Sequence, residues 1–279
     1  ARVAAERGHA VTVLEAADAP GGQVRLTARS PRRAEMIGIV DWRMAECARH
    51  GVTFRFNTLA EAEDVVALAP DVAVIATGGI AEVAELESGA ALAVTPWDIL
   101  SGDVRPGADV LVWDEAGDHA GLMAAEAVAE AGGRVEVMSR DRGVAPEVMG
   151  MNLVPYMRAL QARDATFTVA RRLLGLARAG NRLAATIGTD YSDRRWQADY
   201  DQVIVNEGVT PLDSLYFALR PRSRNGGAVD QAALLGGEGP LFPHANPGGA
   251  FDLYRIGDAV SARNTHAAIH DALRTGLRW

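Results

Sequence analysis

The feature that most constrains the fold is a pattern of alternating strands and helices that starts twice along the chain. The first copy has predicted strands at 11–15 ("VTVLE"), 52–57 and 71–79, with a long helical stretch at 32–51. The second copy begins with the strand 108–114 ("ADVLVWD"), followed by a turn, the helix 121–133 and the strand 134–139. This alternation predicts α/β domains built on parallel sheets.

The second copy lies between two parts of the first. A connector rich in glycine and proline runs from Arg222 to Gly249, and a strand, a tight turn and a helix follow it to the end of the chain. We therefore predict two Rossmann-like, three-layer domains, the second inserted in the first. The predicted limits are 1–101 with 248–279 for an FAD- or ADP-binding domain, and 102–247 for a nicotinamide-type domain.

The first domain lacks its usual opening. The chain starts with a helical segment, and the strand "HAVTVLEA" follows directly. In a dinucleotide-binding unit, a first strand and a G-x-G-x-x-G turn precede this helix, and the backbone N–H groups of the turn bind the pyrophosphate. Neither is present in the sequence. We expect a sheet without its first strand, and poor FAD binding by these 279 residues alone.

Composition excludes several classes of partner. The net charge of −8 disfavours nucleic acid and anionic membranes, because both would be repelled. The single cysteine, Cys47, excludes an intrachain disulfide and a local iron–sulfur or zinc cluster, and a reducing cytoplasm fits this usage. The apolar runs are too short to cross a bilayer. We expect a cytoplasmic protein with neither nucleic acid nor membrane as a partner.

Four short stretches are candidates for cofactor contacts. Glu15 ends a predicted strand, where a dinucleotide fold places an acid that accepts hydrogen bonds from the ribose, although such a position is also common for a solvated charge. "PGGQ" (20–23) offers two glycines for close backbone approach, or a plain turn. "ATGG" (76–79) is a tight crossing after a buried strand. "IGDA" (256–259) is another, with Asp258 suited to a ribityl hydroxyl.

The order of these stretches resembles a known family. Glu15, "PGGQ", "ATGG", an inserted nucleotide-like domain and "YRIGDA" follow one another as in the C-terminal half of the trimethylamine dehydrogenase and 2,4-dienoyl-CoA reductase (NADH:flavin oxidoreductase) family. "VLVWDEAGDHAGLMAAE" and "IGDAVSARNTHAAIHDAL" are most similar to the branch that demethylates dimethylglycine or N-methylproline. The resemblance implies an N-terminal (β/α)8 barrel with FMN and a cysteine-ligated 4Fe–4S cluster upstream of this chain.

The resemblance also implies which residues contact FAD or ADP. Glu15 would bind the ribose, and the other positions would form the loops beside the cofactor. These are Gly22, Gln23 and Leu26, then Ala76, Thr77 and Gly78, then Gly257 and Asp258. No catalytic residue can be named, because the family's substrate chemistry takes place on the barrel.

The function that the resemblance implies is oxidative demethylation of a small N-methylated amine. Electrons would pass through the cluster to an electron-transferring flavoprotein or a similar acceptor, and a homo-oligomer is expected. This chain alone is expected to be inactive. Two alternatives stay open: an NAD(P)H-dependent reductase of an enone or unsaturated thioester, and a non-catalytic module that holds ADP or FAD.

The turn of the second domain argues against a nicotinamide nucleotide. In "WDEAGDHAGL", Asp114, Glu115 and Asp118 lie where the fingerprint glycines would admit a pyrophosphate. Arg140, after the strand 134–139, leaves the 2′-phosphate of NADP as an open alternative.

We expect no metal site in the chain. His266 and His270 have i, i+4 spacing but no third ligand nearby in the sequence. Cys47 lies in a helical run among small and apolar residues, which is typical of a core position rather than a reactive thiol.

Overall fold

The computed structural model describes residues 1–83, 86–236 and 246–278, which form two compact units. Unit 1 comprises Ala1–Arg25, Glu35–Ile80 and Val209–Trp279, and unit 2 comprises Leu26–Ala34 and Ala81–Gly208. The limits predicted from the sequence are 101/102 and 247/248. The structure puts residues 81–101 in unit 2 because Ile99 and Leu100 join its core. It puts the segment after Gly208 in unit 1, where Tyr216 and Leu219 are core residues. Residues 237–245 of the predicted connector lie outside the described residues.

Unit 2 is built on a four-stranded sheet in which every strand is parallel. The strand order is β11-β5-β6-β7. The strands are β5 (Asp109–Asp114), β6 (Arg134–Met138), β7 (Thr166–Thr168) and β11 (Gln202–Asn206).

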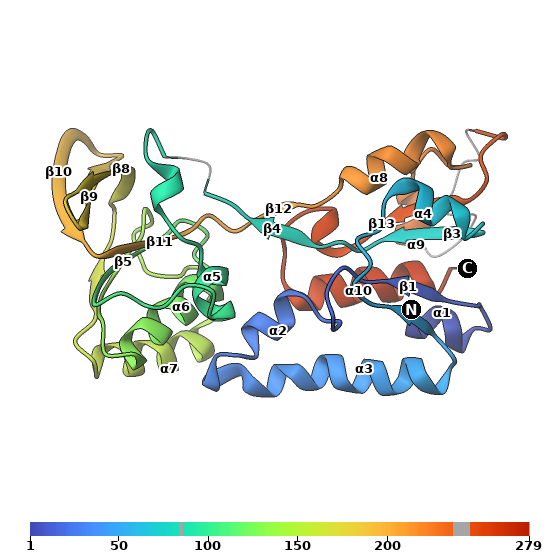
Figure 1. Ribbon diagram of the computed structural model, residues 1–279, viewed down its shortest axis with the longest axis horizontal. Coiled ribbons are helices and arrows are strands. Elements are labelled where there is room, and N and C mark those ends of the chain that lie inside the picture. The colour runs from blue at the N-terminus through green and yellow to red at the C-terminus, as the bar shows by residue number, and fades with distance from the viewer. Residues whose placement is uncertain (84–85, 237–245, 279) are drawn as a thin grey trace. The chain divides into compact units, whose positions relative to one another are not determined.

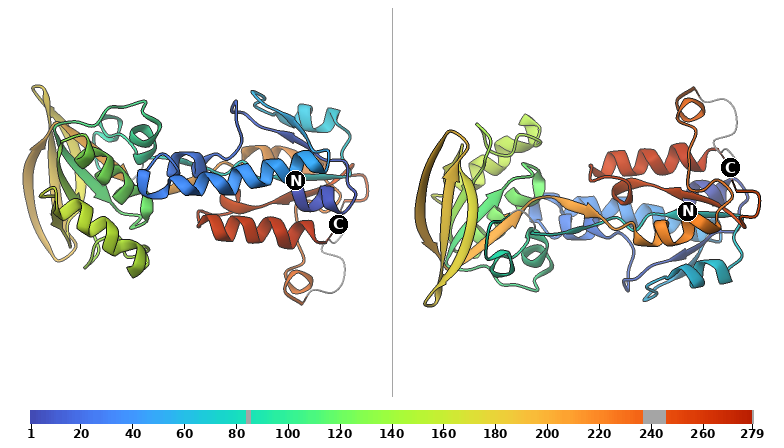
Figure 2. Two further views of the ribbon diagram at one scale, coloured as in Figure 1. Left: turned by 90° about the horizontal axis from the view of Figure 1, so that it is seen from below. Right: turned by 90° about the horizontal axis from the view of Figure 1, so that it is seen from above.

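Alternate residues of β5 face two different layers. Val110 and Val112 pack against α5 (Pro96–Ser101), α6 (His119–Glu130) and α7 (Gly150–Gln161). Leu111 and Trp113 pack on the other face, against a second sheet. Because side chains alternate along a strand, a nearly continuous apolar run such as "VLVW" is the pattern of a sheet covered on both faces. Figures 1 and 2 show these three layers.

The second sheet of unit 2 is an antiparallel meander. It consists of β8 (Arg172–Ala179), β9 (Arg182–Thr189) and β10 (Ser192–Tyr200), paired in the order β10-β9-β8. A two-residue turn at Gly180 and Asn181 joins β8 to β9, with Gly180 at φ +65°. Such a turn needs positive φ, which glycine adopts without strain.

Unit 1 contains two separate pairs of parallel strands. β1 (Thr12–Leu14) pairs with β2 (Thr53–Arg55), and β3 (Val72–Ile75) pairs with β13 (Asp252–Arg255). Among the described strands, no ladder joins the two pairs. A short pair, β4 (Gly79–Ala81) with β12 (Val209–Pro211), follows β3.

The remaining helices are short except for two. α3 (Gly38–Arg49) and α10 (Thr265–Gly276) have three turns each, and a 3-10 segment over Pro31–Ile37 precedes α3 where the sequence predicted a helix from residue 32. α1 packs against both. The others are α1 (Arg2–Glu6), α2 (Gln23–Thr27), α4 (Ala62–Ala67), α8 (Ser214–Leu219) and α9 (Gln231–Gly236). In the part of the chain that the structure describes, no helix has the length and apolarity of a membrane span.

Candidate functional site

Two of the predicted cofactor stretches meet at one edge of unit 1. β3 and β13 are parallel, with Ile75 opposite Arg255, so their carboxyl ends lie together. The Ile256 N–H donates to the Ile75 carbonyl over 3.0 Å and extends this pairing beyond the strands. Residues 76–78 and 257–258 therefore follow neighbouring strands at the edge where α/β sheets bind ligands.

Gly257 is held in a conformation that only glycine adopts easily. Its φ is +61°, and a Cβ there would lie 3.3 Å from Cβ of Ala268 on α10. Its N–H donates to Oδ2 of Asp271 over 3.2 Å. The glycine thus lets the chain turn sharply from β13 onto α10.

Gln23 and Asp258 connect two predicted loops that are 235 residues apart in the sequence. The Gln23 amide donates to Oδ2 of Asp258 over 3.1 Å, and the Arg263 N–H donates to Oδ1 over 3.1 Å. A carboxylate can accept about four hydrogen bonds, so Asp258 retains capacity for a ligand hydroxyl. The structure therefore brings Gln23, Gly257 and Asp258 together, and their contact with a cofactor stays a prediction.

The other glycine turns leave open space beside the backbone. Gly22 and Gly78 have φ of +46° and +73°, and neither would place a Cβ within 4 Å of another group. The Leu212 N–H donates to the Gly78 carbonyl over 3.0 Å, and the Thr77 hydroxyl donates to the Leu212 carbonyl. Thr77 therefore holds the crossing in place, beside the exposed Ala76.

Glu15 lies directly after β1, as predicted. Its N–H donates to the Arg55 carbonyl over 2.9 Å, so the pairing of β1 with β2 extends through this residue. One carboxylate oxygen accepts the Ala17 N–H over 3.0 Å. The side chain is partly exposed, and the carboxylate has the acceptor capacity that two ribose hydroxyls would require.

Leu26 lies in the same short helix as Gln23, α2. It belongs to unit 2 and packs against the helical core there. Two neighbouring arginines fix the same segment: Arg32 pairs with the buried Glu126, Nη2 to Oε1 2.5 Å, and Arg33 Nε donates to the Tyr156 hydroxyl over 3.1 Å. The cofactor role of Leu26 stays a prediction.

A cavity of about 300 Å³ adjoins the Gly257 turn in unit 1. Ile256 and Asp271 line it, together with three arginines whose guanidinium groups interact with other residues. Arg255 pairs with Asp213 over 2.5 Å and lies 4.6 Å from the centre of the Tyr216 ring, and Arg263 pairs with Asp271. The third arginine is Arg274.

The turn of unit 2 is filled by its own carboxylates. Asp118 is the N-cap of α6 and accepts the Ala120 N–H over 2.8 Å. The Asn206 amide donates to Oδ1 of Asp114 over 2.7 Å and to Oδ1 of Asp118 over 2.9 Å. The N-terminus of α6, where a dinucleotide fold binds pyrophosphate, therefore already has a negative side chain on it.

Asp114 is fully buried in this turn. Oδ1 accepts from Asn206 and from the Gly117 N–H, whereas Oδ2 has no hydrogen-bond partner among the described residues. A Cβ on Gly121 would lie only 2.7 Å from Cγ of Asp114, so the carboxylate occupies the space beside the first turn of α6. Burial, and secondarily the charge of Asp118, raises the pKa of Asp114 to about 7, although two hydrogen bonds act in the opposite direction.

His119, the first residue of α6, is uncharged at neutral pH. Burial and the neighbouring Arg33 guanidinium lower the pKa of its imidazole to about 4. Nη2 of Arg33 lies 2.8 Å from Nδ1 and 2.7 Å from Nε2 of the ring. Asn206 is the residue of this turn that could not be predicted from the sequence. It meets Asp114 and Asp118 only because β11 lies beside β5.

Cys47 and the histidine pair of α10 were predicted to be structural. Cys47 is 4 % exposed, and burial raises the pKa of its thiol, as expected of a core residue. The rings of His266 and His270 stack with their centres 6.5 Å apart on an exposed face.

The α/β fold is similar to that of solved structures that include a flavoprotein disulfide reductase and a thioredoxin reductase. The crystal structure of thioredoxin reductase from T. acidophilum aligns with a TM-score of 0.62 at 15% identity, covering 99% of this chain and 91% of that chain. A complex of 2-naphthoyl-CoA reductase with 2-naphthoyl-CoA aligns with a TM-score of 0.81 at 27% identity, covering 100% of this chain and 37% of that chain. No protein-family model matches the chain.

Two curated relatives match almost the whole chain. A probable N-methylproline demethylase of Rhizobium meliloti (strain 1021) is 58% identical over 274 residues, which is 98% of this chain and 40% of the relative. The N,N-dimethylglycine/sarcosine dehydrogenase of Chromohalobacter salexigens is 40% identical over 98% of this chain and 41% of its own length. The chain thus spans about two fifths of the length of these curated relatives.

These comparisons support the family that the sequence resembles. The two curated relatives are named as a demethylase and a dehydrogenase, and the solved structure is that of a reductase. All three names denote oxidoreductases. A further relative from Caballeronia cordobensis, 35% identical over 99% of this chain and 41% of its own length, is named a multifunctional alkene reductase/demethylase.

Proposed function

We propose that this chain is the C-terminal, nucleotide-binding part of a flavin-dependent oxidoreductase that demethylates a small N-methylated amine or amino acid. The observation that carries the proposal is the 58% identity to the probable N-methylproline demethylase, because it extends over 98% of the chain. The second curated relative supports the same class of substrate, since its name also specifies an N-methylated amino acid.

The residues of unit 1 fit FAD or ADP. Gly22 and Gly78 leave open space where a Cβ would be, and Asp258 retains acceptor capacity beside Gln23. Glu15 offers a carboxylate at the carboxyl end of β1 for the adenosine ribose. These residues would bind and orient the nucleotide, and a bound flavin would supply two-electron redox chemistry.

The rest of the protein would supply the catalytic parts. We place FMN, a 4Fe–4S cluster and the substrate pocket in an N-terminal barrel, with electrons leaving to an electron-transferring flavoprotein or a similar acceptor, and we expect a homo-oligomer. A strand from the rest of the protein would lie between the β1–β2 and β3–β13 pairs. Two-stranded sheets are only marginally stable by themselves, and a central strand would join both pairs into one sheet.

The test uses the intact protein with N-methylproline in the absence of oxygen. Demethylation consumes one water and yields the secondary amine, one formaldehyde, two protons and two electrons, so bleaching of the flavin spectrum should accompany release of formaldehyde. Dimethylglycine is the matched second substrate. The absence of both bleaching and formaldehyde with either amine would contradict the proposal.

The reductase alternative is favoured by the likeness to 2-naphthoyl-CoA reductase and by the relative that is named an alkene reductase/demethylase. It requires a nicotinamide nucleotide to reach a flavin, whereas the turn of unit 2 is occupied by Asp114 and Asp118. Rapid bleaching of the intact protein by NADH or NADPH would favour this alternative. The non-catalytic module would be favoured if the intact protein had no flavin in unit 1 and released no formaldehyde from either amine.

Glu15→Ala is expected to weaken FAD or ADP binding by the intact protein about 10-fold or more. A carboxylate that accepts from both ribose hydroxyls makes charge-assisted hydrogen bonds worth roughly 1.5–3 kcal/mol. Asp18→Ala is the matched control, because Asp18 is an exposed acid three residues further along the same loop. Nucleotide affinity is measured by calorimetry after removal of the bound cofactor. Equal affinities of the Glu15→Ala and control proteins would rule out the ribose assignment.

A further inference from the structure

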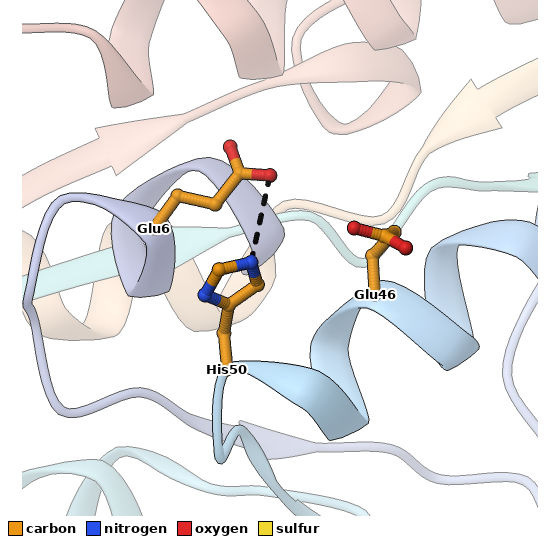
Figure 3. A group of neighbouring side chains, drawn as sticks. All are labelled: Glu6, Glu46 and His50. Atoms are coloured by element: carbon orange, nitrogen blue, oxygen red, sulfur yellow. Dashed lines mark ion pairs between the residues drawn. The ribbon is translucent and has the colours of Figure 1, made fainter.

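Three potential metal ligands, none of them a predicted cofactor residue, lie together in unit 1. Figure 3 shows Glu6 on α1 with Glu46 and His50 at the end of α3. One ligand atom from each residue lies within 4.8 Å of the other two. Oε1 of Glu6 and Nε2 of His50 are 3.9 Å apart. Two carboxylates and an imidazole form a set of donors that suits a divalent transition metal ion.

The local sequence accounts for this convergence. Glu46 and His50 have i, i+4 spacing, so they share a face of α3, and the His50 N–H donates to the Glu46 carbonyl over 3.2 Å. Between them, the buried Cys47 anchors α3 in the core. Ala4 and Ala5 are buried on α1, which packs against α3, and Glu6 follows them in the same short helix.

We propose that Glu6, Glu46 and His50 bind a zinc-like divalent transition metal ion. Ligand atoms about 2.0–2.2 Å from a tetrahedral ion are roughly 3.3–3.6 Å from one another. The 3.9 Å between Oε1 of Glu6 and Nε2 of His50 exceeds this by about 0.3–0.6 Å, and no two of the three donor atoms are more than 4.8 Å apart. Glu6 and His50 are exposed, and rotation of these two side chains supplies that movement without disturbing the core.

Two arginines compete with the metal without closing the site. Arg49 pairs with Oε1 of Glu46 over 2.9 Å, but its side chain is 75% exposed, and exposed ion pairs contribute little. Arg2 pairs with Oε1 of Glu6, and its guanidinium also lies 5.1 Å from the centre of the Trp42 ring. Arg2 therefore keeps a partner after metal binding, and each carboxylate has a second oxygen to offer.

The imidazole decides which ions fit. Mg²⁺ and Ca²⁺ prefer oxygen donors throughout, whereas imidazole suits Zn²⁺, Ni²⁺ and Cu²⁺. A bound ion would join the ends of α1 and α3. β1, which leads to Glu15, follows α1 directly, so the ion would stabilise the part of unit 1 from which the ribose acid projects.

The test is calorimetric titration of the intact, chelator-treated protein with Zn²⁺. We expect a site with Kd below about 100 μM, and either His50→Ala or Glu46→Gln should weaken it at least 10-fold. His270→Ala is the matched control, because His270 is also exposed and has a histidine at i−4, and its titration should match the wild type within twofold. Mg²⁺ at the same concentration should give no binding heat.

A second measurement separates metal binding from damage to the fold. Zn²⁺ should raise the unfolding temperature of the wild type and of His270→Ala, but not that of Glu46→Gln. An unchanged far-UV circular dichroism spectrum shows that Glu46→Gln is folded. If His50→Ala or Glu46→Gln does not fold, Glu6→Gln takes its place in both measurements, because Glu6 is exposed. An unchanged Zn²⁺ site in His50→Ala and Glu46→Gln, or equal loss in His270→Ala, would overturn the proposal.

Discussion

The stabilisation of unit 2 by protonated Asp114 is expected to fall by up to about 4 kcal/mol between pH 4 and pH 9, and Asp114→Asn is expected to remove this contribution. The pKa of Asp114 rises from 3.8 to about 7 on folding, mainly because the carboxyl is buried. Between these values the folded protein holds a proton that the unfolded chain has released. The stabilisation is therefore complete below pH 4 and is lost as the pH rises through 7.

The measurement follows local opening of unit 2 in the intact protein by amide hydrogen exchange. The readout is the opening free energy of peptides that cover β5 and α6 in the wild type minus that in Asp114→Asn, after correction for the intrinsic exchange rate, and this difference should fall from pH 5 to pH 9. The lowered pKa of His119, about 4, makes unit 2 more stable as the pH rises, but it does so in both proteins and cancels in the difference. Glu130→Gln, at an exposed position at the end of α6, is the control and should retain the wild-type dependence. A difference between the wild type and Asp114→Asn that is the same at pH 5 and pH 9 would show that Asp114 is ionised throughout.

The sequence could predict features that depend on local pattern. The apolar run "VLVW" predicts a strand buried on both faces, and Asp114 and Asp118 are read directly as carboxylates at the turn that follows it. The order of strands and helices along the chain likewise predicts the α/β fold. Each of these inferences needs only the spacing of residues within about one strand–turn–helix unit.

Features that depend on distant segments could not be predicted from such spacing. Asn206 bridges Asp114 and Asp118 only because β11 pairs in parallel with β5, which places Asn206 opposite Asp114. Leu26 packs in unit 2 because Arg32 and its neighbours bind groups on α6 and α7. The spacing of apolar residues predicts the helices and strands, whereas the strand order and the packing decide which polar groups meet.

The cluster of Glu6, Glu46 and His50 depends partly on local spacing and partly on a distant segment. The i, i+4 spacing of Glu46 and His50 is visible in the sequence, just as that of His266 and His270 is. Only the packing of α1 against α3 supplies a third ligand, Glu6, to the first pair. The spacing of two ligands is therefore a weak signal until a third element is placed beside them.

NADH and NADPH are both expected not to bind unit 2. A pyrophosphate at the N-terminus of α6 would lie against the side chain of Asp118, the N-cap, and against that of Asp114. The Asn206 amide donates a hydrogen bond to each of these two side chains. One pair of like charges about 4 Å apart costs about 4 kcal/mol at an effective dielectric constant of 20. Arg140 does not offset this for NADPH, because its guanidinium already pairs with Asp190 over 2.6 Å and with Glu115 over 3.2 Å.

Calorimetric titration of the intact protein tests this, with amide exchange to locate any binding. Since a nucleotide could bind elsewhere in the longer protein, protection of residues 112–124 is the readout specific to unit 2. Neither nucleotide should protect these residues, and neither should bind there with Kd below about 100 μM, or about −5.5 kcal/mol. Protection with either one would revive the reductase alternative. If neither protects the turn, the carboxylates take the place of a ligand phosphate, and the electrons of the proposed demethylase must leave through a protein acceptor rather than through a nicotinamide in unit 2.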